Sequence, residues 1–279
     1  MIDEGIRVSR RWLALREPAD AAARAPDLVD HIRRRLPASG RLMIHDLGCG
    51  TGAMGRWLAR RLPGPQHWIV HDRDPALLEL AVAEPPGPAA DGAAATVAAG
   101  RSDIARLRPG DLADASLITA SALLDLLTEE ELTRVVAACV GAGCPALLTL
   151  SVVGRVELTP AHPLDRRVAA AFDAHQRRST SGGRLLGPGA VALVRHEFGQ
   201  RGAEVLVRPS PWRLGAAEAD LAAEWLAGWM DAACEQDAGL AAEIDGYRSR
   251  RLDEARAGRL TVTVDHADLL ALPGANGAR

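Results

Sequence analysis

The chain has 279 residues, which is enough for one large α/β domain with insertions, and a formal net charge of −3. Its 48% hydrophobic and 25% charged residues are typical of soluble globular proteins, and no apolar run reaches the roughly 20 residues that a membrane span requires. The 33 basic residues are all arginines and are dispersed. The sequence therefore predicts neither a membrane protein nor a continuous basic surface for nucleic acid.

The cysteines and the amino terminus exclude two further classes. None of the cysteines has C-x-x-C spacing or paired histidines nearby: they are Cys49, Cys139, Cys144 and Cys234. Neither a metal site nor a disulfide framework is predicted. The first residues, M-I-D-E-G-I-R, include acids and lack the apolar core of a secretory signal, so we expect a cytoplasmic protein.

Short helices are predicted ahead of the first strand. Residues 7–36 have helical spacing, with a break expected at Pro18. Pro26 and Asp27 mark a new helix start, because proline is tolerated in a first helical turn and aspartate caps it. We assign residues 1–40 to an N-terminal helical cap.

Strands and helices alternate through the next hundred residues. The predicted elements are a strand at about 42–46, a helix at 52–62, a short apolar strand before Asp72, a helix from about Asp74, a strand at 95–99, a strand at 116–120, a helix at 129–140 and a strand at 145–153. This rhythm predicts a doubly wound α/β sheet of the Rossmann-like kind, and the last of these strands is apolar enough to be buried on both faces.

Two helical insertions are predicted in the second half of the chain, within a main domain that spans residues 41–273. The first insertion, at about 154–186, is expected to lie as a lid over the carboxyl ends of the strands, and the second is expected at about 211–258. Helices are predicted at 165–177, 187–202, 216–235 and 240–257, a strand at 203–208, an alternating antiparallel edge strand at about 260–266, and a disordered tail at 274–279.

One stretch carries the functional signal: residues 44–55 read I-H-D-L-G-C-G-T-G-A-M-G. A glycine-spaced loop between a strand and a helix brings backbone N–H groups against a bound nucleotide-type molecule. Its last three glycines also match the dinucleotide pattern G-x-G-x-x-G, which alone is a weak signal. Two acids make the glycine-loop signal more specific, because Asp46 lies two residues before the first glycine and Asp72 lies 20 residues beyond Gly52.

At H-D-L-G-C-G-T-G the sequence resembles the class I methyltransferases that use S-adenosylmethionine. The resemblance covers the sheet core, roughly residues 40–153. It implies S-adenosylmethionine as cofactor and a seven-stranded, mostly parallel sheet with an antiparallel last strand.

The resemblance also implies a set of cofactor contacts. Asp46 would orient the loop or meet the cationic amino group, Asp72 would accept from both ribose hydroxyls, and Asp103 would accept from the adenine amino group. Simpler alternatives stay open: Asp103 could instead be an acid of a surface loop, and Cys49 a small residue that fits the loop. The candidate cofactor residues are Asp46, Gly48, Cys49, Gly50, Gly52, Asp72, Arg73, Ser102, Asp103, Ile104 and Ser121.

The acceptor side is less well defined. His162 and His175 in the first insertion are weak candidates for a general base, with exposed lid histidines as the simpler interpretation. Where methyltransferases of nucleic-acid or protein amines show N/D-P-P-[YF], this chain shows A-S-A-L-L-D-L-L. That difference favours a small-molecule acceptor, with O-methylation slightly ahead of N- or C-methylation. No catalytic residue follows from the sequence, and no metal is expected.

Three alternatives remain open at this point. An NAD(P)-dependent oxidoreductase would keep the sheet and Asp72, but the chain has one tyrosine, Tyr247, and no lysine for the usual catalytic set. An RNA methyltransferase would need an arginine-rich lid surface. A non-catalytic protein that keeps the cofactor fold would bind the cofactor without turnover. Trp12, in the first helix, is a candidate for closing the site.

Overall fold

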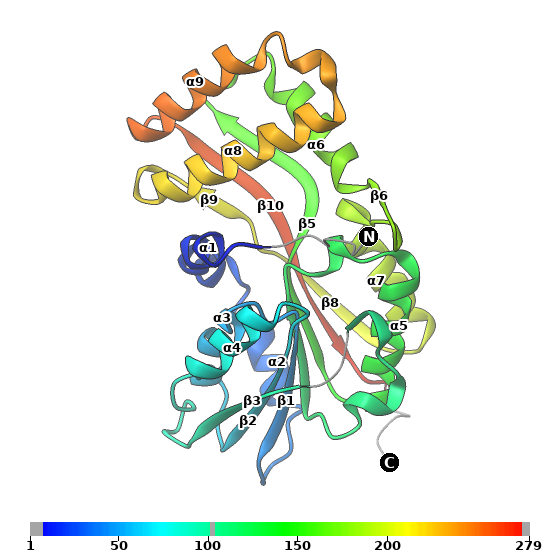
Figure 1. The fold of residues 1–279 in the computed structure, drawn as a ribbon. Helices are drawn as coiled ribbons and strands as arrows, with labels where there is room; N and C mark the ends of the chain where they lie inside the picture. The colour runs from blue at the N-terminus through cyan, green and yellow to red at the C-terminus, as the bar shows by residue number, and fades with distance from the viewer. Residues whose placement is uncertain (1–7, 101–103, 275–279) are drawn as a thin grey trace.

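The computed structural model describes residues 8–100 and 104–274, and a mixed sheet forms their centre (Figure 1). Within these ranges the strand order is β3-β2-β1-β4-β5-β10-β8, and β9 pairs with the first part of β10. The strands are β1 (Leu42–Leu47), β2 (Gln66–His71), β3 (Ala95–Ala99), β4 (Leu117–Ser121), β5 (Ala146–Thr159), β8 (Glu204–Pro209), β9 (Trp212–Leu214) and β10 (Thr261–Leu272).

The strand directions confirm the predicted fold class. Strands β1 to β5 pair in parallel, whereas β10 runs antiparallel to both β5 and β8. The sheet is therefore Rossmann-like and mostly parallel with an antiparallel last strand, as predicted, and β9 adds an eighth strand to the expected seven.

The position predicted for the last strand was wrong. β10 lies between β5 and β8 rather than at an edge, and it continues to Leu272. The alternating residues 261–266 belong to its outer half, while the following apolar run is buried on both sides of the sheet. β5 likewise continues to Thr159, beyond the predicted end at Val153, because its outer half pairs with the outer half of β10.

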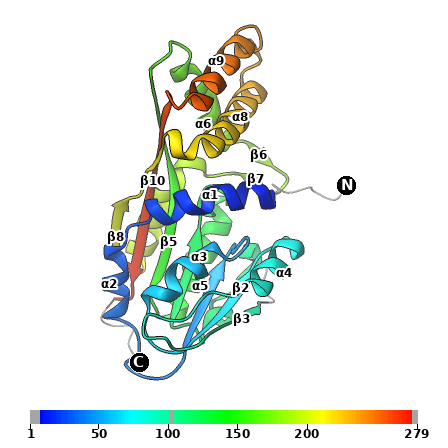
Figure 2. The ribbon, with the colours of Figure 1, turned by 90° about the vertical axis from the view of Figure 1, so that its left-hand side faces the viewer.

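Helices cover both faces of the sheet: Figure 1 shows α3 and α4 on one side and α5 and α7 on the other, and Figure 2 looks onto the side of α3 and α4. On one face α2, α3 and α4 pack on β1 and β2, around buried Trp57 and Trp68. On the other face α5 and α7 pack on β4 and β5, around buried Phe198. These helices are α2 (Asp27–Arg33), α3 (Ala53–Leu58), α4 (Pro75–Ala83), α5 (Glu129–Ala142) and α7 (Ala190–Gln200).

The predicted helix caps are confirmed. The Asp74 carboxylate accepts from the backbone amides of Ala76 and Leu77 at the start of α4. Thr128 and Glu131 form a capping box that begins α5. In both cases a side-chain oxygen satisfies backbone amides that a first helical turn leaves without a partner.

The first helix, α1 (Arg10–Ala23), does not break at Pro18 as predicted. A proline inside a helix removes one backbone hydrogen bond. Here the Arg16 guanidinium pairs with the Asp20 carboxylate one turn later, at 2.9 and 3.2 Å, and so bridges the weak point. Asp20 also accepts from the indole N–H of Trp212 at 2.9 Å, which fixes α1 against β9.

A third layer is built on the outer halves of β5 and β10. We call this part, with β9 and three helices, the cap; it lies at the top of Figure 1. Its helices are α6 (Asp165–Gln176), α8 (Ala219–Gln236) and α9 (Ile244–Arg256). They enclose their own apolar core with Trp225 and Trp229, which lie on one helical face as predicted and stack at 5.1 Å. No helix among the described residues is long and apolar enough to cross a membrane.

Candidate functional site

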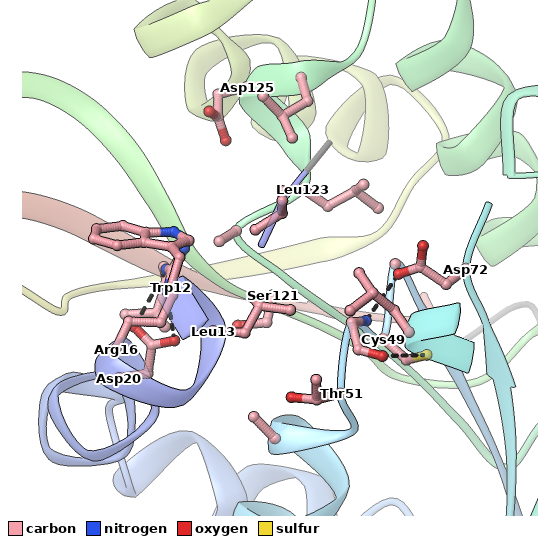
Figure 3. Close-up of a pocket in the computed structure, with 18 of the residues that line it drawn as sticks. Trp12, Leu13, Arg16, Asp20, Cys49, Thr51, Asp72, Ser121, Leu123 and Asp125 are labelled. Atoms are coloured by element: carbon pink, nitrogen blue, oxygen red, sulfur yellow. Dashed lines mark hydrogen bonds and ion pairs between the residues drawn. The ribbon is translucent and has the colours of Figure 1, made fainter. Parts of the chain in front are cut away.

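A cavity of about 1630 Å³ opens between the glycine loop, α1 and the cap. A pocket for one small ligand usually measures roughly 300–1,000 Å³, so this cavity has room for a cofactor together with a second molecule. Figure 3 shows α1 along one side, with Trp12 and Arg16, and the loop residues Cys49 and Thr51 opposite. This placement agrees with the prediction that Trp12 is a candidate for closing the site.

The glycine loop adopts a backbone that suits glycine. Gly48, Gly50 and Gly52 have φ values of 67°, 53° and 84°, in the left-handed region where other residues are strained. A Cβ on Gly50 would also lie 3.2 Å from the Leu13 side chain of α1, so the helix lies directly against the loop. Gly48 and Gly50 line the cavity, whereas Gly52 begins α3 and does not line it.

The Asp72 carboxylate helps to hold the glycine loop in place (Figure 3). One carboxylate oxygen accepts from the Gly50 amide at 2.8 Å, and the other accepts from the Asp74 amide at 2.9 Å. Each oxygen keeps further lone pairs on the side of the cavity, which Asp72 and Arg73 both line. The predicted contact of Asp72 with ribose hydroxyls therefore stays open as a prediction, and the structure adds that this carboxylate shapes the loop.

Asp46 ends β1 deep in the cavity, with 1% of its surface exposed. One of its oxygens accepts from the Thr119 hydroxyl at 2.7 Å, while the other, Oδ2, has no hydrogen-bond partner among the described residues. Burial raises the pKa of Asp46 to about 7, although the Thr119 hydrogen bond and the charge of Arg24 oppose that shift. Near pH 7 the Asp46 side chain is therefore present in both its neutral and its ionised form, and its Oδ2 is not used by the described part of the protein.

Arg24, which follows α1, is the main residue that the sequence did not predict. It is 3% exposed, lines the cavity and donates to the Ser121 hydroxyl at 3.0 Å, while its Nη1 has no hydrogen-bond partner among the described residues. Its guanidinium lies 5.4 Å from the centre of the Trp57 ring. Burial lowers the pKa of Arg24, partly offset by Asp20. No motif marks this arginine in the sequence, because its role depends on where the chain turns between α1 and α2.

That turn is fixed by a buried acid. The Asp268 carboxylate of β10 accepts from the Ala25 amide and from the Leu150 amide, each at 2.8 Å. Leu150 has a φ of 55°, a strained value for leucine that this hydrogen bond helps to hold. The residue after Arg24 is thereby tied to the centre of the sheet, which presents the guanidinium to the cavity.

The remaining predicted cofactor residues divide into two groups. Cys49, Ile104 and Ser121 line the cavity, and burial raises the pKa of the Cys49 thiol, so it is no activated nucleophile. Ser102 and Asp103 lie outside the described residues, so their predicted cofactor contacts, including that of Asp103 with adenine, stay predictions.

The two histidines considered as general bases do not line the cavity. The His162 ring accepts from the Leu164 amide and lies edge-on to Tyr247 within the cap. His175 pairs with Glu235 at 3.0 Å between α6 and α8. Both positions give these histidines roles in holding cap helices together, and we assign neither a place in the chemistry.

The cap supplies the other wall of the cavity. Aromatic side chains from α1, α6, β9 and α8 line it: Trp12, Phe172, Trp212, Trp225 and Trp229. Among the described lining residues, eight carboxylates face three guanidiniums, so the cavity as a whole is acidic. His266 of β10 also lines it, and burial lowers its pKa to about 3, which keeps the imidazole neutral.

Comparison with known proteins gives no named family. No protein-family model and no curated protein matches the chain. Solved structures do match. The cyclopropane synthase MmaA2 from Mycobacterium tuberculosis is 15% identical, over 95% of this chain and 94% of that chain, with a TM-score of 0.48.

Two further solved structures are methyltransferases crystallised with S-adenosylhomocysteine. A S-adenosylmethionine-dependent methyltransferase from Geobacter sulfurreducens is 16% identical over 98% of this chain and 100% of that chain, with a TM-score of 0.42. The phosphoethanolamine N-methyltransferase 2 of Haemonchus contortus is 16% identical, with a TM-score of 0.42. The match covers 89% of this chain but 52% of that one, so the chain spans about half its length.

Proposed function

We propose that the chain is a methyltransferase that uses S-adenosylmethionine and acts on a small-molecule acceptor. The observation that carries this proposal is a pair of buried, unsatisfied polar atoms beside the glycine loop: Arg24 Nη1 and Asp46 Oδ2. Native proteins satisfy the great majority of buried polar atoms, so two unsatisfied atoms of opposite charge in one cavity indicate a missing ligand. A zwitterionic amino-acid group matches both.

The donor set suits the amino-acid and ribose parts of the cofactor. Arg24 would hold the carboxylate of its methionine part, and the free oxygen of Asp46 would accept from its amino group. The amides of the glycine loop, held by Asp72, would approach the ribose closely because the glycines carry no side chain. The cavity volume of about 1630 Å³ leaves space beyond the cofactor for an acceptor.

When bound, S-adenosylmethionine supplies an activated methyl group, and the protein contributes chiefly alignment. α1 would exclude water from the site, because Leu13 contacts the loop and Glu17 pairs with Arg56 of α3 at 2.6 and 2.8 Å. The cap would orient the acceptor through its aromatic wall. A base is needed only where the acceptor must lose a proton.

The alternatives have less support. The tyrosine that an oxidoreductase would use donates to Asp165 at 2.6 Å in the cap and does not line the cavity. An acidic cavity disfavours RNA, whose phosphates require a basic surface. A protein that binds the cofactor without turnover is separated from an enzyme by measuring S-adenosylhomocysteine formation with acceptors present. The sequence favoured oxygen as the methyl acceptor, whereas the acidic lining of the cavity favours nitrogen.

The free carboxylate of Asp46 predicts a pH dependence that tests the proposed cofactor. Only the ionised form pairs with an amino cation, and its pKa is about 7. Binding of S-adenosylhomocysteine should therefore strengthen roughly tenfold per unit from pH 5 to pH 7 and level off above that. Isothermal titration at five pH values measures this.

Asp46→Asn is the matched variant, because it keeps the shape and the hydrogen bond with Thr119 but does not titrate. It should bind the ligand more weakly and with little pH dependence over the same range. An unchanged slope in Asp46→Asn would show that another group controls binding and that the amino contact is assigned wrongly.

A further inference from the structure

Besides Asp20, which pairs with Arg16, four carboxylates from outside the glycine-loop region line the cavity, and three of them already have partners. The four are Asp125, Glu131, Glu224 and Asp231. The engaged pairs are Glu131 with the Thr128 amide at 2.8 Å, Asp231 with Arg248 at 2.5 Å and Glu224 with Arg11 at 3.6 Å. Each of these three carboxylates thus already accepts a hydrogen bond or pairs with an arginine within the protein.

Asp125 differs from them. It follows β4, and its carboxylate projects into the upper part of the cavity in Figure 3. No other side chain among the described residues gives it a hydrogen bond or an ion pair. The charge of Arg16 lowers the pKa of Asp125, but the Arg16 guanidinium is itself held by both oxygens of Asp20. Burial raises the pKa of Asp125 to about 6, so it is ionised at neutral pH at an energetic cost that a cationic ligand would relieve.

Aromatic rings line the same cavity as Asp125. Arg16 shows how these rings hold a cation, since its guanidinium lies 5.8 Å from the Trp12 ring and 5.0 Å from the Trp212 ring. The stacked pair Trp225 and Trp229 on α8 also lines the cavity, and no guanidinium of the described residues lies over either ring. Trp229 keeps a buried indole N–H without a hydrogen-bond partner in the described structure.

Asp125 and the tryptophan rings favour some kinds of methyl acceptor over others. A carboxylate acceptor would add a negative charge beside Asp125, and an alcohol would leave that charge uncompensated. An ammonium group pairs with the carboxylate and is attracted by indole faces, while an apolar body fits the tryptophan wall.

We propose that the methyl acceptor is an amine with an apolar or aromatic body, held as a cation by Asp125 against the tryptophans of α8 and methylated on nitrogen. This rests on the proposed function and names its substrate class. Asp125 is then a catalytic residue, since it contacts the reacting nitrogen.

The step balances without a further reactant. The ammonium nitrogen gives one proton to the Asp125 carboxylate and regains a lone pair. That pair forms the bond to the methyl carbon while the methyl–sulfur bond breaks, and its electrons remain on sulfur, which becomes a neutral thioether. The product is a methylated ammonium ion, and the proton passes from Asp125 to solvent.

The experiment uses three probes of matched shape: 2-phenylethylamine, 2-phenylethanol and phenylacetate. Each is titrated into the full-length protein saturated with S-adenosylhomocysteine, so that binding is read without turnover. We expect the amine to bind at least tenfold more tightly than the other two, the scale of one charged hydrogen bond. Asp125→Asn should lose that preference, while its affinity for S-adenosylhomocysteine stays within about twofold.

Asp253→Asn is the control, because it makes the same change on the exposed surface of α9, outside the cavity. Equal binding of alcohol and amine, failure of the amine to bind, or an unchanged preference in Asp125→Asn each overturns the proposal. If the wild-type protein does not bind S-adenosylhomocysteine, the proposed function itself fails, which is a different result.

Discussion

Replacing Arg251 by methionine is expected to lower the free energy of unfolding by about 3–5 kcal/mol, the usual cost of removing one partner from a buried ion pair. The Arg251 side chain is fully buried in the cap. It donates to both oxygens of Asp165 at 2.6 and 2.7 Å, to Glu254 at 2.7 Å and to the Pro160 carbonyl at 2.8 Å. Methionine fills much of the space but leaves Asp165 without its ion-pair partner, while Glu254 keeps Arg250.

Urea unfolding of the wild type and the variant measures this effect. The control is Arg256→Met on the same helix, whose side chain is 70% exposed and lies 3.6 Å from Asp253. Surface ion pairs contribute about 0–1 kcal/mol, so the control should unfold almost as the wild type does. Equal, small losses in both variants would show that the Arg251 network does not hold the cap together.

The second large effect concerns Arg24. Arg24→Met is expected to weaken S-adenosylhomocysteine binding about 30- to 150-fold, which corresponds to about 2–3 kcal/mol for a lost charged hydrogen bond. The reason is that Nη1 is the unsatisfied buried donor in the part of the cavity next to Asp46. Arg24→Lys should fall between the two, because lysine keeps the charge but not the planar guanidinium.

Arg208→Met is the matched control, since Arg208 pairs with Asp27 at 2.7 Å outside the cavity. Affinities are measured by isothermal titration at a temperature where thermal melts show every variant folded. Wild-type affinity in Arg24→Met, or an equal loss in Arg208→Met, would contradict the assigned carboxylate contact.

Local sequence signals predicted the fold because they act over short distances. The glycine spacing at 48–52, the capping oxygen of Asp74 and the capping box at Thr128 each depend on residues a few positions apart. All three have the predicted conformation. The sheet order could not be read in the same way, and β10 was misplaced because only its outer half alternates.

The sequence predicted the acids beside the glycine loop as site residues, but it predicted neither Arg24 nor Asp125. Asp46 and Asp72 follow strands whose ends a parallel sheet brings to one edge, so their placement follows from the fold class. Arg24 reaches the same place through a turn tied to Asp268, a residue 243 positions away from Ala25. Asp125 lies in a run of leucines without a motif. Such long-range contacts leave no periodic signal in the sequence.

The sequence also could not place the two histidines considered as general bases. His162 and His175 were considered because imidazole titrates near neutral pH, a property of the residue type alone. Their cap contacts with Tyr247 and Glu235 decide their role, and these partners lie 85 and 60 positions further along the chain. Residue type alone could not place these two side chains, and neither of them lines the cavity.

The central claim is that the cavity binds S-adenosylmethionine and not a dinucleotide. Isothermal titration of the protein with S-adenosylhomocysteine and, separately, with NAD⁺ tests it most directly. We expect binding of S-adenosylhomocysteine, no binding of NAD⁺, and a loss of about 1–3 kcal/mol of binding free energy in Asp72→Ala. Heat with NAD⁺ alone would contradict the claim.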